Sequence, residues 1–221
     1  YNHGIDSTSL IECIFGETKT SSDEYFNDWH KIWHKKGTVD TSDLVLLDGY
    51  EETDFDSLGT TKNITSVMNI LPHDKILEIG CGAGNLSQHF NEYDYIGIDY
   101  SRPLVNKNIK LTKSTIYHCE AKNTPFKDNY FDKTFACSVF EYFPNKEYAI
   151  KVIHEMIRVT KPGGMIYIMN LRKVTHAERK NKHVYDGCFT HQVYTPDDFD
   201  GFDITDPTYD KINRFSIIKT V

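Results

Sequence analysis

The sequence lacks the features that mark membrane, secreted and zinc-binding small proteins. No apolar run approaches the ~18 residues that a membrane-spanning helix needs, and the first residues are polar, unlike a signal peptide. The five cysteines are widely spaced and include no C-x-x-C pair, so the spacing predicts neither a disulfide framework nor a zinc knuckle. We therefore expect no membrane span and a reducing, cytoplasmic setting.

An excess of positive charge is also missing. Lys and Arg number 25 against 32 Asp and Glu, which gives a net charge of −7. A chain with this balance has no overall positive field that would attract nucleic acid or an anionic membrane. Because 39% of the residues are hydrophobic, an ordinary globular fraction, we expect a folded protein whose substrate is a small polar molecule, a saccharide or a protein group, and not a nucleic acid.

Residues 1–50 form a polar segment that contains one helical pattern. The stretch 21–36 predicts a helix because Ser22 or Asp23 can cap it, two lysines fill its last turn, and Gly37 follows. We expect this segment to act as a helical lid over a second unit, residues 51–221. The chain lacks an initiator Met, so we also expect it to be one domain of a longer protein.

Two tryptophans lie on one face of this predicted helix. Trp29 and Trp33 are four residues apart, which makes them candidate substrate-binding residues, and packing on the main domain is the alternative. His30 and His34 have the same spacing, but the sequence offers no third ligand beside them. We therefore predict no metal site.

From residue 59 onward, helical and strand patterns alternate. Ile64, Val67, Met68 and Leu71 mark a helix that ends at Pro72. The next segments predict strand 75–80, helix 84–93, strand 94–99, helix 102–110 and strand 114–119. Strand 131–140, a helix with an apolar stripe between residues 149 and 157, strand 163–170 and two short strands, 202–205 and 214–221, complete the chain. Such alternation predicts an α/β fold, a doubly wound sheet with helices on both faces.

The most informative motif is LEIGCGAGN, where a strand ends in a glycine-rich turn. The glycines allow a tight turn and a close backbone approach to a ligand. A dinucleotide site requires G-x-G-x-x-G, but the last glycine position is occupied by Asn85, which weakens an NAD-dependent oxidoreductase without excluding it. Asp99 ends the next strand, where an acid of this fold binds ribose hydroxyls.

Five motifs in this order resemble those of the class I S-adenosylmethionine-dependent methyltransferases, type 11-like, over residues 59–221: EIGCGAGN, IGIDYS, CEAKNTPF, FDKTFACSVFEYF and VTKPGG. The resemblance implies a Rossmann-like sheet of seven strands with the last one antiparallel. It also implies S-adenosylmethionine as the cofactor and S-adenosylhomocysteine as the product. The cofactor-binding residues that it implies are Glu78, Gly80, Cys81, Gly82, Asn85, Asp99, Tyr100, Glu120, Ala121 and Ser138.

The resemblance leaves the acceptor and the catalytic base open. Members of this family often have Leu-Glu-His after the fourth strand, where this chain has Phe140, Glu141 and Tyr142, so a His base is missing there. We take Tyr142, His176 and His191 as candidate catalytic residues and Phe140 as a further substrate contact.

An aromatic lid suits the apolar face of a sugar, so we hypothesise a sugar O-methyltransferase. A weaker resemblance, to the methyltransferase domains of multidomain glycan-building enzymes of large DNA viruses, favours the same acceptor. An amine or protein acceptor, and a cofactor-binding module without transfer activity, are the alternatives.

Overall fold

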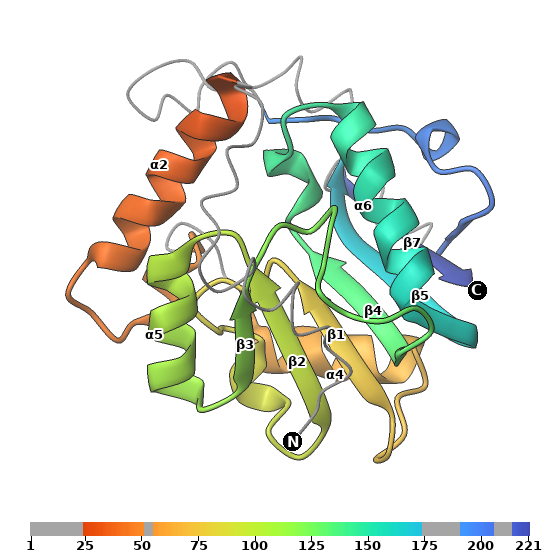
Figure 1. The fold of residues 1–221 in the computed structure, drawn as a ribbon, viewed down its shortest axis with the longest axis horizontal. Helices are drawn as coiled ribbons and strands as arrows, with labels where there is room; N and C mark the ends of the chain where they lie inside the picture. Colours follow the sequence, from red (N-terminus) through yellow and green to blue (C-terminus); the bar gives the residue numbers. More distant parts are fainter. Residues whose placement is uncertain (1–23, 51–54, 174–190, 206–213) are drawn as a thin grey trace.

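The computed structural model describes residues 24–50, 55–173, 191–205 and 214–221. These residues form a seven-stranded sheet with the order β3-β2-β1-β4-β5-β7-β6 (Figure 1). Strands β1 to β5 pair in parallel, whereas β7 is antiparallel to both β5 and β6. The predicted doubly wound sheet with an antiparallel last strand is therefore confirmed. The strands are β1 (Lys75–Ile79), β2 (Asp94–Asp99), β3 (Thr115–His118), β4 (Phe131–Cys137), β5 (Thr160–Arg172), β6 (Asp203–Ile204) and β7 (Arg214–Thr220).

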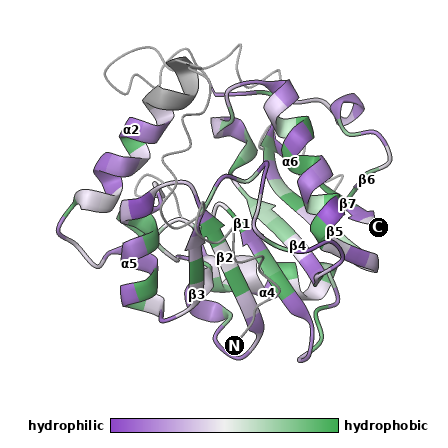
Figure 2. Ribbon diagram, in the orientation of Figure 1, coloured by the Kyte–Doolittle hydropathy of each residue, from purple (hydrophilic) through white to green (hydrophobic). Residues whose placement is uncertain are grey.

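Helices cover both faces of the sheet: α4 (Ser57–Val67), α5 (Arg102–Thr112) and α6 (Lys146–Val159) (Figure 1). Side chains alternate along each strand, so Leu77 of β1 packs in the cluster that contains Val152 of α6. Its neighbour Ile76 packs on the opposite side in the cluster that contains Ile64 of α4 and Val105 of α5. The central strands are accordingly hydrophobic on both faces (Figure 2).

Helix α2 (Glu24–Thr38) confirms the predicted helix 21–36 within a few residues and packs beside α5. Gly37 permits this contact, because a Cβ there would lie 2.6 Å from the Leu104 nitrogen. A short helix that the sequence did not predict, α3 (Leu44–Leu47), follows, and its Leu47 is buried against Ala83 and Leu104. The segment thus contacts both the first glycine-rich turn and α5. Among the described residues, no helix is long and apolar enough to cross a membrane.

Two predicted helices differ in the structure. Helix α4 ends at Val67, and Leu71 is 42% exposed, because Asn69 has a left-handed φ of 46° that stops the helix before Leu71. The predicted helix 84–93 is only a 3-10 turn, η1 (Ser87–His89). The buried Ser87 hydroxyl lies 2.8 Å from the Tyr95 hydroxyl, so this side chain is committed to the core instead of to a helix surface.

Candidate active site

A cavity of about 740 Å³ opens at the carboxyl ends of β1, β2 and β4, and side chains of α2 line its other side. Its volume lies within the roughly 300 to 1,000 Å³ range of small-ligand sites. In open α/β sheets, ligands bind outside the carboxyl ends of the strands, which is where this cavity lies. The wall residues come from the lid segment, from the glycine-rich turn and from the ends of β4, β5 and β7.

A buried polar network supports the glycine-rich turn. Glu78, at 3% exposure, accepts a hydrogen bond from the Tyr95 hydroxyl, which also contacts Ser87. Asn108 of α5 continues the network, since its Nδ2 donates to Ser87 Oγ at 3.1 Å and to the Gly82 carbonyl at 3.1 Å. The network holds the turn through both a side chain and a carbonyl, which rigidifies it.

Two carboxylates accept hydrogen bonds from the backbone of this turn. Asp99 Oδ2 accepts from Gly82 N at 2.9 Å, and its Oδ1 accepts from Ser101 N at 2.7 Å. Asp48, which directly follows α3, accepts from Ala83 N at 2.5 Å through Oδ1 and from Asn85 N at 2.9 Å through Oδ2. The N–H groups that a dinucleotide pyrophosphate would need are therefore occupied, which argues against the NAD alternative.

The part of the cavity beside the glycine-rich turn, which we call the cofactor end, is lined by the carboxyls of Glu78, Asp48 and Asp99. The pKa of Glu78 is raised to about 8 and that of Asp48 to about 7, chiefly by burial and in smaller part by the charge of Asp99. Burial also raises the pKa of Asp99, although its backbone hydrogen bonds oppose this. A cationic ligand would favour the ionised carboxylates, so this end of the cavity suits a positive charge.

Several buried polar atoms around the cavity lack hydrogen-bond partners among the described residues. They are Asn85 Nδ2, Ser101 Oγ and Glu120 Oε1, on side chains that are at most 8% exposed. Buried polar groups are normally paired, so these three atoms mark places for ligand atoms. Asn85 and Ser101 line the cavity together with Asp99 and Ala121, where the ribose and adenine of a nucleoside cofactor would fit, and Glu120 directly precedes Ala121.

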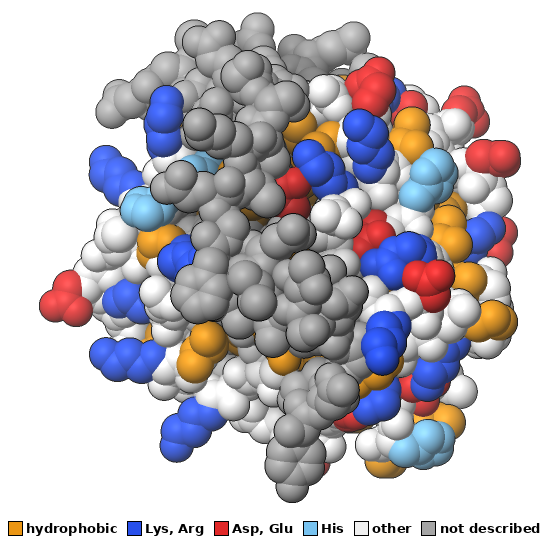
Figure 3. Space-filling view, viewed as in Figure 1, with side chains coloured by type: hydrophobic (Ala, Val, Ile, Leu, Met, Phe, Trp, Pro, Cys, Tyr) orange, Lys and Arg blue, Asp and Glu red, His pale blue; other side chains and the backbone are white. Residues whose placement is uncertain are grey.

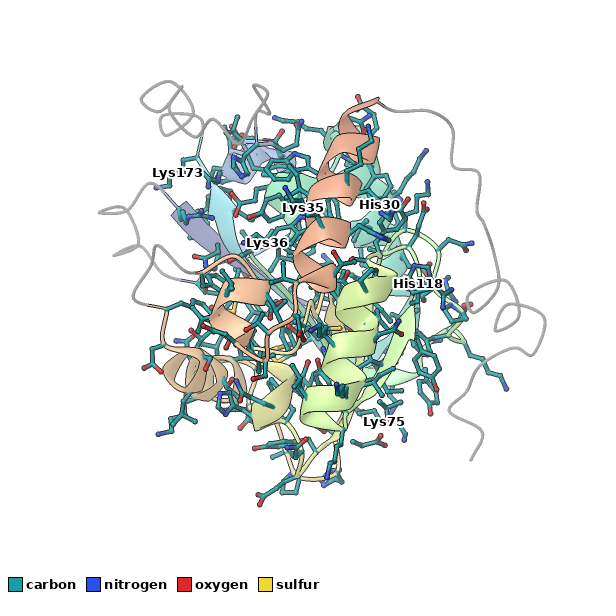
Figure 4. All side chains as sticks on the ribbon, turned by 90° about the vertical axis from the view of Figure 1, so that its left-hand side faces the viewer. His30, Lys35, Lys36, Lys75, His118 and Lys173 are labelled. Atoms are coloured by element: carbon teal, nitrogen blue, oxygen red, sulfur yellow. The ribbon has the colours of Figure 1, made fainter. Side chains whose placement is uncertain are left out.

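Tyr100 forms the outer wall of this nucleoside region. Its ring meets His30 of α2 edge to face at a centroid distance of 4.5 Å, and its carbonyl oxygen lies 2.9 Å from His118 Nε2. His30 and His118 both lie on the side of the molecule where α2 packs along α5 (Figure 4). The lid helix therefore takes part in closing the cofactor end.

Two residues with left-handed backbone meet between the cofactor end and the other part of the cavity, which is lined by Trp29, Trp33 and Tyr142 and which we call the acceptor end. Ser138 follows β4 with a φ of 57°, and Asn170 in β5 has a φ of 62°. Asn170 Nδ2 donates to Ser138 Oγ at 2.9 Å, and both residues line the cavity. Such conformations in residues other than glycine concentrate at functional sites. Tyr50, whose hydroxyl interacts with Ser138, lies at the same place.

An aromatic cluster covers the acceptor end. Tyr142 meets Trp29 at 4.8 Å and Trp33 at 5.0 Å, both edge to face. His191 lies 4.8 Å from Trp29 and 5.3 Å from Tyr142, measured between ring centroids. The two tryptophans of α2 thus line the cavity and pack against the main domain at the same time.

Two arginines and a buried glutamate complete the acceptor end. Glu141, at 3% exposure, forms ion pairs with Arg172 and with Arg214, the latter at 3.2 Å. Arg214 also donates to the Asn170 carbonyl at 2.7 Å. Two guanidinium groups therefore engage the carboxylate of Glu141. The cavity is thus acidic at one end and contains arginines at the other.

Comparisons with known proteins agree with this geometry. Residues 77–168 match the family model described as a methyltransferase domain. Residues 77–168 thus carry a methyltransferase domain. A probable tRNA methyltransferase 9B of Bos taurus is 34% identical over 114 residues, which are 51% of this chain and 24% of that protein. A ubiquinone/menaquinone biosynthesis C-methyltransferase of Burkholderia mallei is 31% identical over 127 residues, 53% of this chain and 51% of that protein.

Solved structures show the same fold. The phosphoethanolamine N-methyltransferase 1 of Haemonchus contortus, solved with phosphoethanolamine and S-adenosylhomocysteine, has a TM-score of 0.68 at 13% identity. The alignment covers 93% of this chain and 50% of that one. A magnesium protoporphyrin IX methyltransferase of Synechocystis, solved with bound S-adenosylmethionine, has a TM-score of 0.56 at 15% identity and covers 91% of this chain. The chain spans about a quarter of the length of the tRNA methyltransferase relatives, so its acceptor is a matter for proposal.

Most residues that the sequence predicted for the methyltransferase site line the cavity: Trp29, Trp33, Glu78, Gly80, Cys81, Gly82, Asn85, Asp99, Tyr100, Ala121, Ser138 and Tyr142. Glu120 lies beside Ala121 and pairs with Lys122 at 3.1 Å. His191 contacts the aromatic cluster, and His176 lies outside the described residues.

Phe140 is not brought to the methyltransferase cavity. Its side chain is 2% exposed and packs against Phe143 at 4.8 Å, because the 3-10 turn η2 (Phe140–Tyr142) points it into the core. Sequence reasoning missed the lining residues Asp48, Tyr50, Phe55, Asn170, Arg172 and Arg214. Arg172 stands next to Lys173 in a basic pair of the sequence, but no motif marks Arg214, Asp48 or Asn170. Within the described ranges, no group of three His, Cys, Asp or Glu could hold a metal ion.

Proposed function

We propose that this chain transfers the methyl group of S-adenosylmethionine to a hydroxyl of a small polar acceptor, with a saccharide as the leading candidate. The observation that supports it best is the single cavity in which the acidic cofactor end and the aromatic acceptor end meet at Ser138 and Asn170. S-adenosylmethionine supplies a methyl group on a positively charged sulfur. The chain must align the acceptor with it, exclude water and remove a proton.

Each part of the cofactor end has a role in binding. Asp99 has acceptor positions left for the ribose hydroxyls after its two backbone hydrogen bonds. Tyr100 packs on the adenine, and Glu120 Oε1 and the Ala121 N–H address the edge of the base. Glu78 holds the turn around Gly80 and Gly82, where the backbone can approach the methionine portion closely. The unpartnered Oε1 supports the role of Glu120, and the other roles rest on the motifs.

The acceptor end supports a sugar hydroxyl. Trp29, Trp33 and Tyr142 present ring edges and faces of the kind on which the apolar face of a sugar packs. His191 contacts this cluster and is our candidate base, which would take the acceptor proton on its imidazole, with Tyr142 as the second candidate. His176 is a third candidate from the sequence. None of the compared proteins has a name that refers to a sugar acceptor.

An RNA acceptor is the second candidate, and a basic surface favours it. Helices α2 and α5 lie side by side and carry Lys and Arg without an Asp or Glu in residues 29–38 and 102–113 (Figures 3 and 4). A groove between them is lined by His34, Arg102, Lys107 and Lys110. Although the whole chain is acidic, this local charge could bind phosphates, and the bovine relative is named a tRNA methyltransferase.

Methyl transfer from isotope-labelled S-adenosylmethionine to a saccharide panel and to a tRNA mixture tests the proposal. A labelled saccharide supports the leading acceptor. Labelled tRNA, with transfer that falls steeply with salt and in the Lys107→Ala variant, supports the second. Binding of S-adenosylmethionine without transfer to any acceptor, saccharides, tRNA, amines and proteins included, identifies a non-catalytic module. Mass spectrometry of the copurified ligand shows whether the cofactor is bound at all.

A further inference from the structure

Asp48 joins the lid segment to the glycine-rich turn in a way that no motif indicates. Its backbone N–H donates to the Leu44 carbonyl at 3.0 Å and so ends α3. The Gly49 N–H donates to the Leu46 carbonyl, and Gly49 turns the chain with a φ of 77°. The side chain reaches Ala83 N at 2.5 Å and Asn85 N at 2.9 Å. Both oxygens of one carboxylate therefore bind the turn that contacts the cofactor.

The turn offers an anion site, and the chain fills that site itself. Successive backbone N–H groups at a strand-to-helix turn form a concave site that binds phosphate in dinucleotide and nucleotide folds. Here the Asp48 carboxylate occupies the concave side, and it crowds the turn. A Cβ at Gly82 would lie 2.3 Å from Asp48 Oδ1, so the glycine is required by Asp48 and not only by a ligand.

The position of Asp48 depends on the lid. Leu47, the residue before it, is 1% exposed and packs with Ala83 and Leu104. The side chain of Ala83 thus packs against Leu47, and its backbone N–H donates to Asp48. Any displacement of α3 would remove both contacts and free the N–H groups of the turn.

We propose that Asp48 is a positioning and specificity-determining residue, which holds the glycine-rich turn and selects a cationic, unphosphorylated nucleoside cofactor. The inference rests on the proposed function and names what selects the cofactor. The carboxylate blocks the site that a pyrophosphate or phosphate would use. Asp48, Glu78 and Asp99 also line the cavity together, and a cationic sulfonium would favour the ionised form of these carboxyls, which a neutral thioether would not.

The test compares binding of S-adenosylmethionine, S-adenosylhomocysteine and inorganic phosphate by calorimetry in three variants. Asp48→Asn keeps the shape but removes the charge, and Asp48→Ala empties the anion site. Asp43→Ala is the matched control, because Asp43 caps the same helix through Val45 N and Leu46 N but lies on its exposed side. Thermal unfolding shows which variants are folded.

For Asp48→Asn we expect the affinity for S-adenosylmethionine to fall about tenfold or more, and to fall more than that for S-adenosylhomocysteine. For Asp48→Ala we expect millimolar phosphate to compete with the cofactor, which it does not do in the parent chain. Asp43→Ala should lower the unfolding temperature and leave the affinity ratio unchanged. A purely structural role would change stability without changing the ratio or creating phosphate sensitivity.

The outcomes separate this inference from the proposed function. If the parent chain does not bind S-adenosylmethionine, the proposed function fails. If the parent chain binds it and Asp48→Asn keeps both the affinity and the ratio, the inference is overturned while the function stands. Should Asp48→Ala not fold, Asp48→Asn decides the question, because it retains the side-chain volume.

Discussion

Replacing Asp99 by Asn tests the ribose contact, which depends on how the carboxylate distributes its hydrogen bonds. A carboxylate has about four acceptor positions. Asp99 uses two of them for Gly82 N at 2.9 Å and Ser101 N at 2.7 Å, which leaves two for the ribose hydroxyls. An amide keeps one acceptor oxygen and no charge, so at least one charged hydrogen bond to the ribose is lost. At about 1.5 to 3 kcal/mol for such a bond, the Kd should rise about 10- to 150-fold.

The assay is calorimetric titration of S-adenosylhomocysteine and of its 2′-deoxy analogue into both proteins, which forms a double-mutant cycle. The analogue should bind the parent chain more weakly, and Asn at position 99 should remove most of that difference. Asp94→Asn is the control, since Asp94 begins the same strand at the far end and pairs with Lys75 on the surface. An equal loss from the analogue in both proteins, with the variant folded, would refute the ribose contact.

Three further predictions concern the lid, the base and pH. Trp33→Ala should leave the sheet folded but slow methyl transfer, because Trp33 lines the cavity and helps to exclude water. Full turnover in this variant would show that Trp33 only packs against the main domain. His191→Ala should lower kcat about 10²- to 10⁴-fold with cofactor affinity unchanged. Because burial raises the pKa of Asp48 to about 7 and of Glu78 to about 8, the ligand-free fold binds protons that the unfolded chain has released. Its free energy of unfolding in urea should therefore fall from pH 5 to pH 8, and it should fall less steeply in Asp48→Asn. A free energy of unfolding that stays constant over this range would contradict the raised pKa values.

The sheet could be predicted from the sequence because its strands are short apolar runs between clear helical stripes. KILEI and DYIGID form strands at the predicted residues, since both faces are buried and no polar alternation blurs the pattern. The predicted helix after the glycine-rich turn failed for a tertiary reason. The Ser87 side chain is committed to the core, so it does not mark a helix surface, and the Asn85 backbone N–H is bound by Asp48.

The site contains residues that the sequence predicts and residues that only the tertiary structure brings together. Residues inside contiguous motifs, such as Glu78 and Asp99, could be predicted because the fold fixes their position at the ends of strands. Asp48 and Asn170 could not, since their roles arise from contacts between distant segments: one crosses from α3 to the turn, and the other depends on a left-handed backbone in β5. Phe140 was misassigned because a single 3-10 turn decides which of three consecutive side chains faces the cavity.

The charge arrangement also bears on how the cofactor end distinguishes substrate from product. Burial raises the pKa of Asp48, Glu78 and Asp99 in the empty cavity, and the charge of Asp99 adds to the rise for the other two. A bound positive charge favours the ionised carboxylates and is bound more tightly in return. Transfer of the methyl group removes the positive charge from the sulfur. The same carboxyls then stabilise the bound product less than the bound substrate. A site that uses its acids in this way binds the reactant in preference to the product, which favours product release without any movement of the sheet.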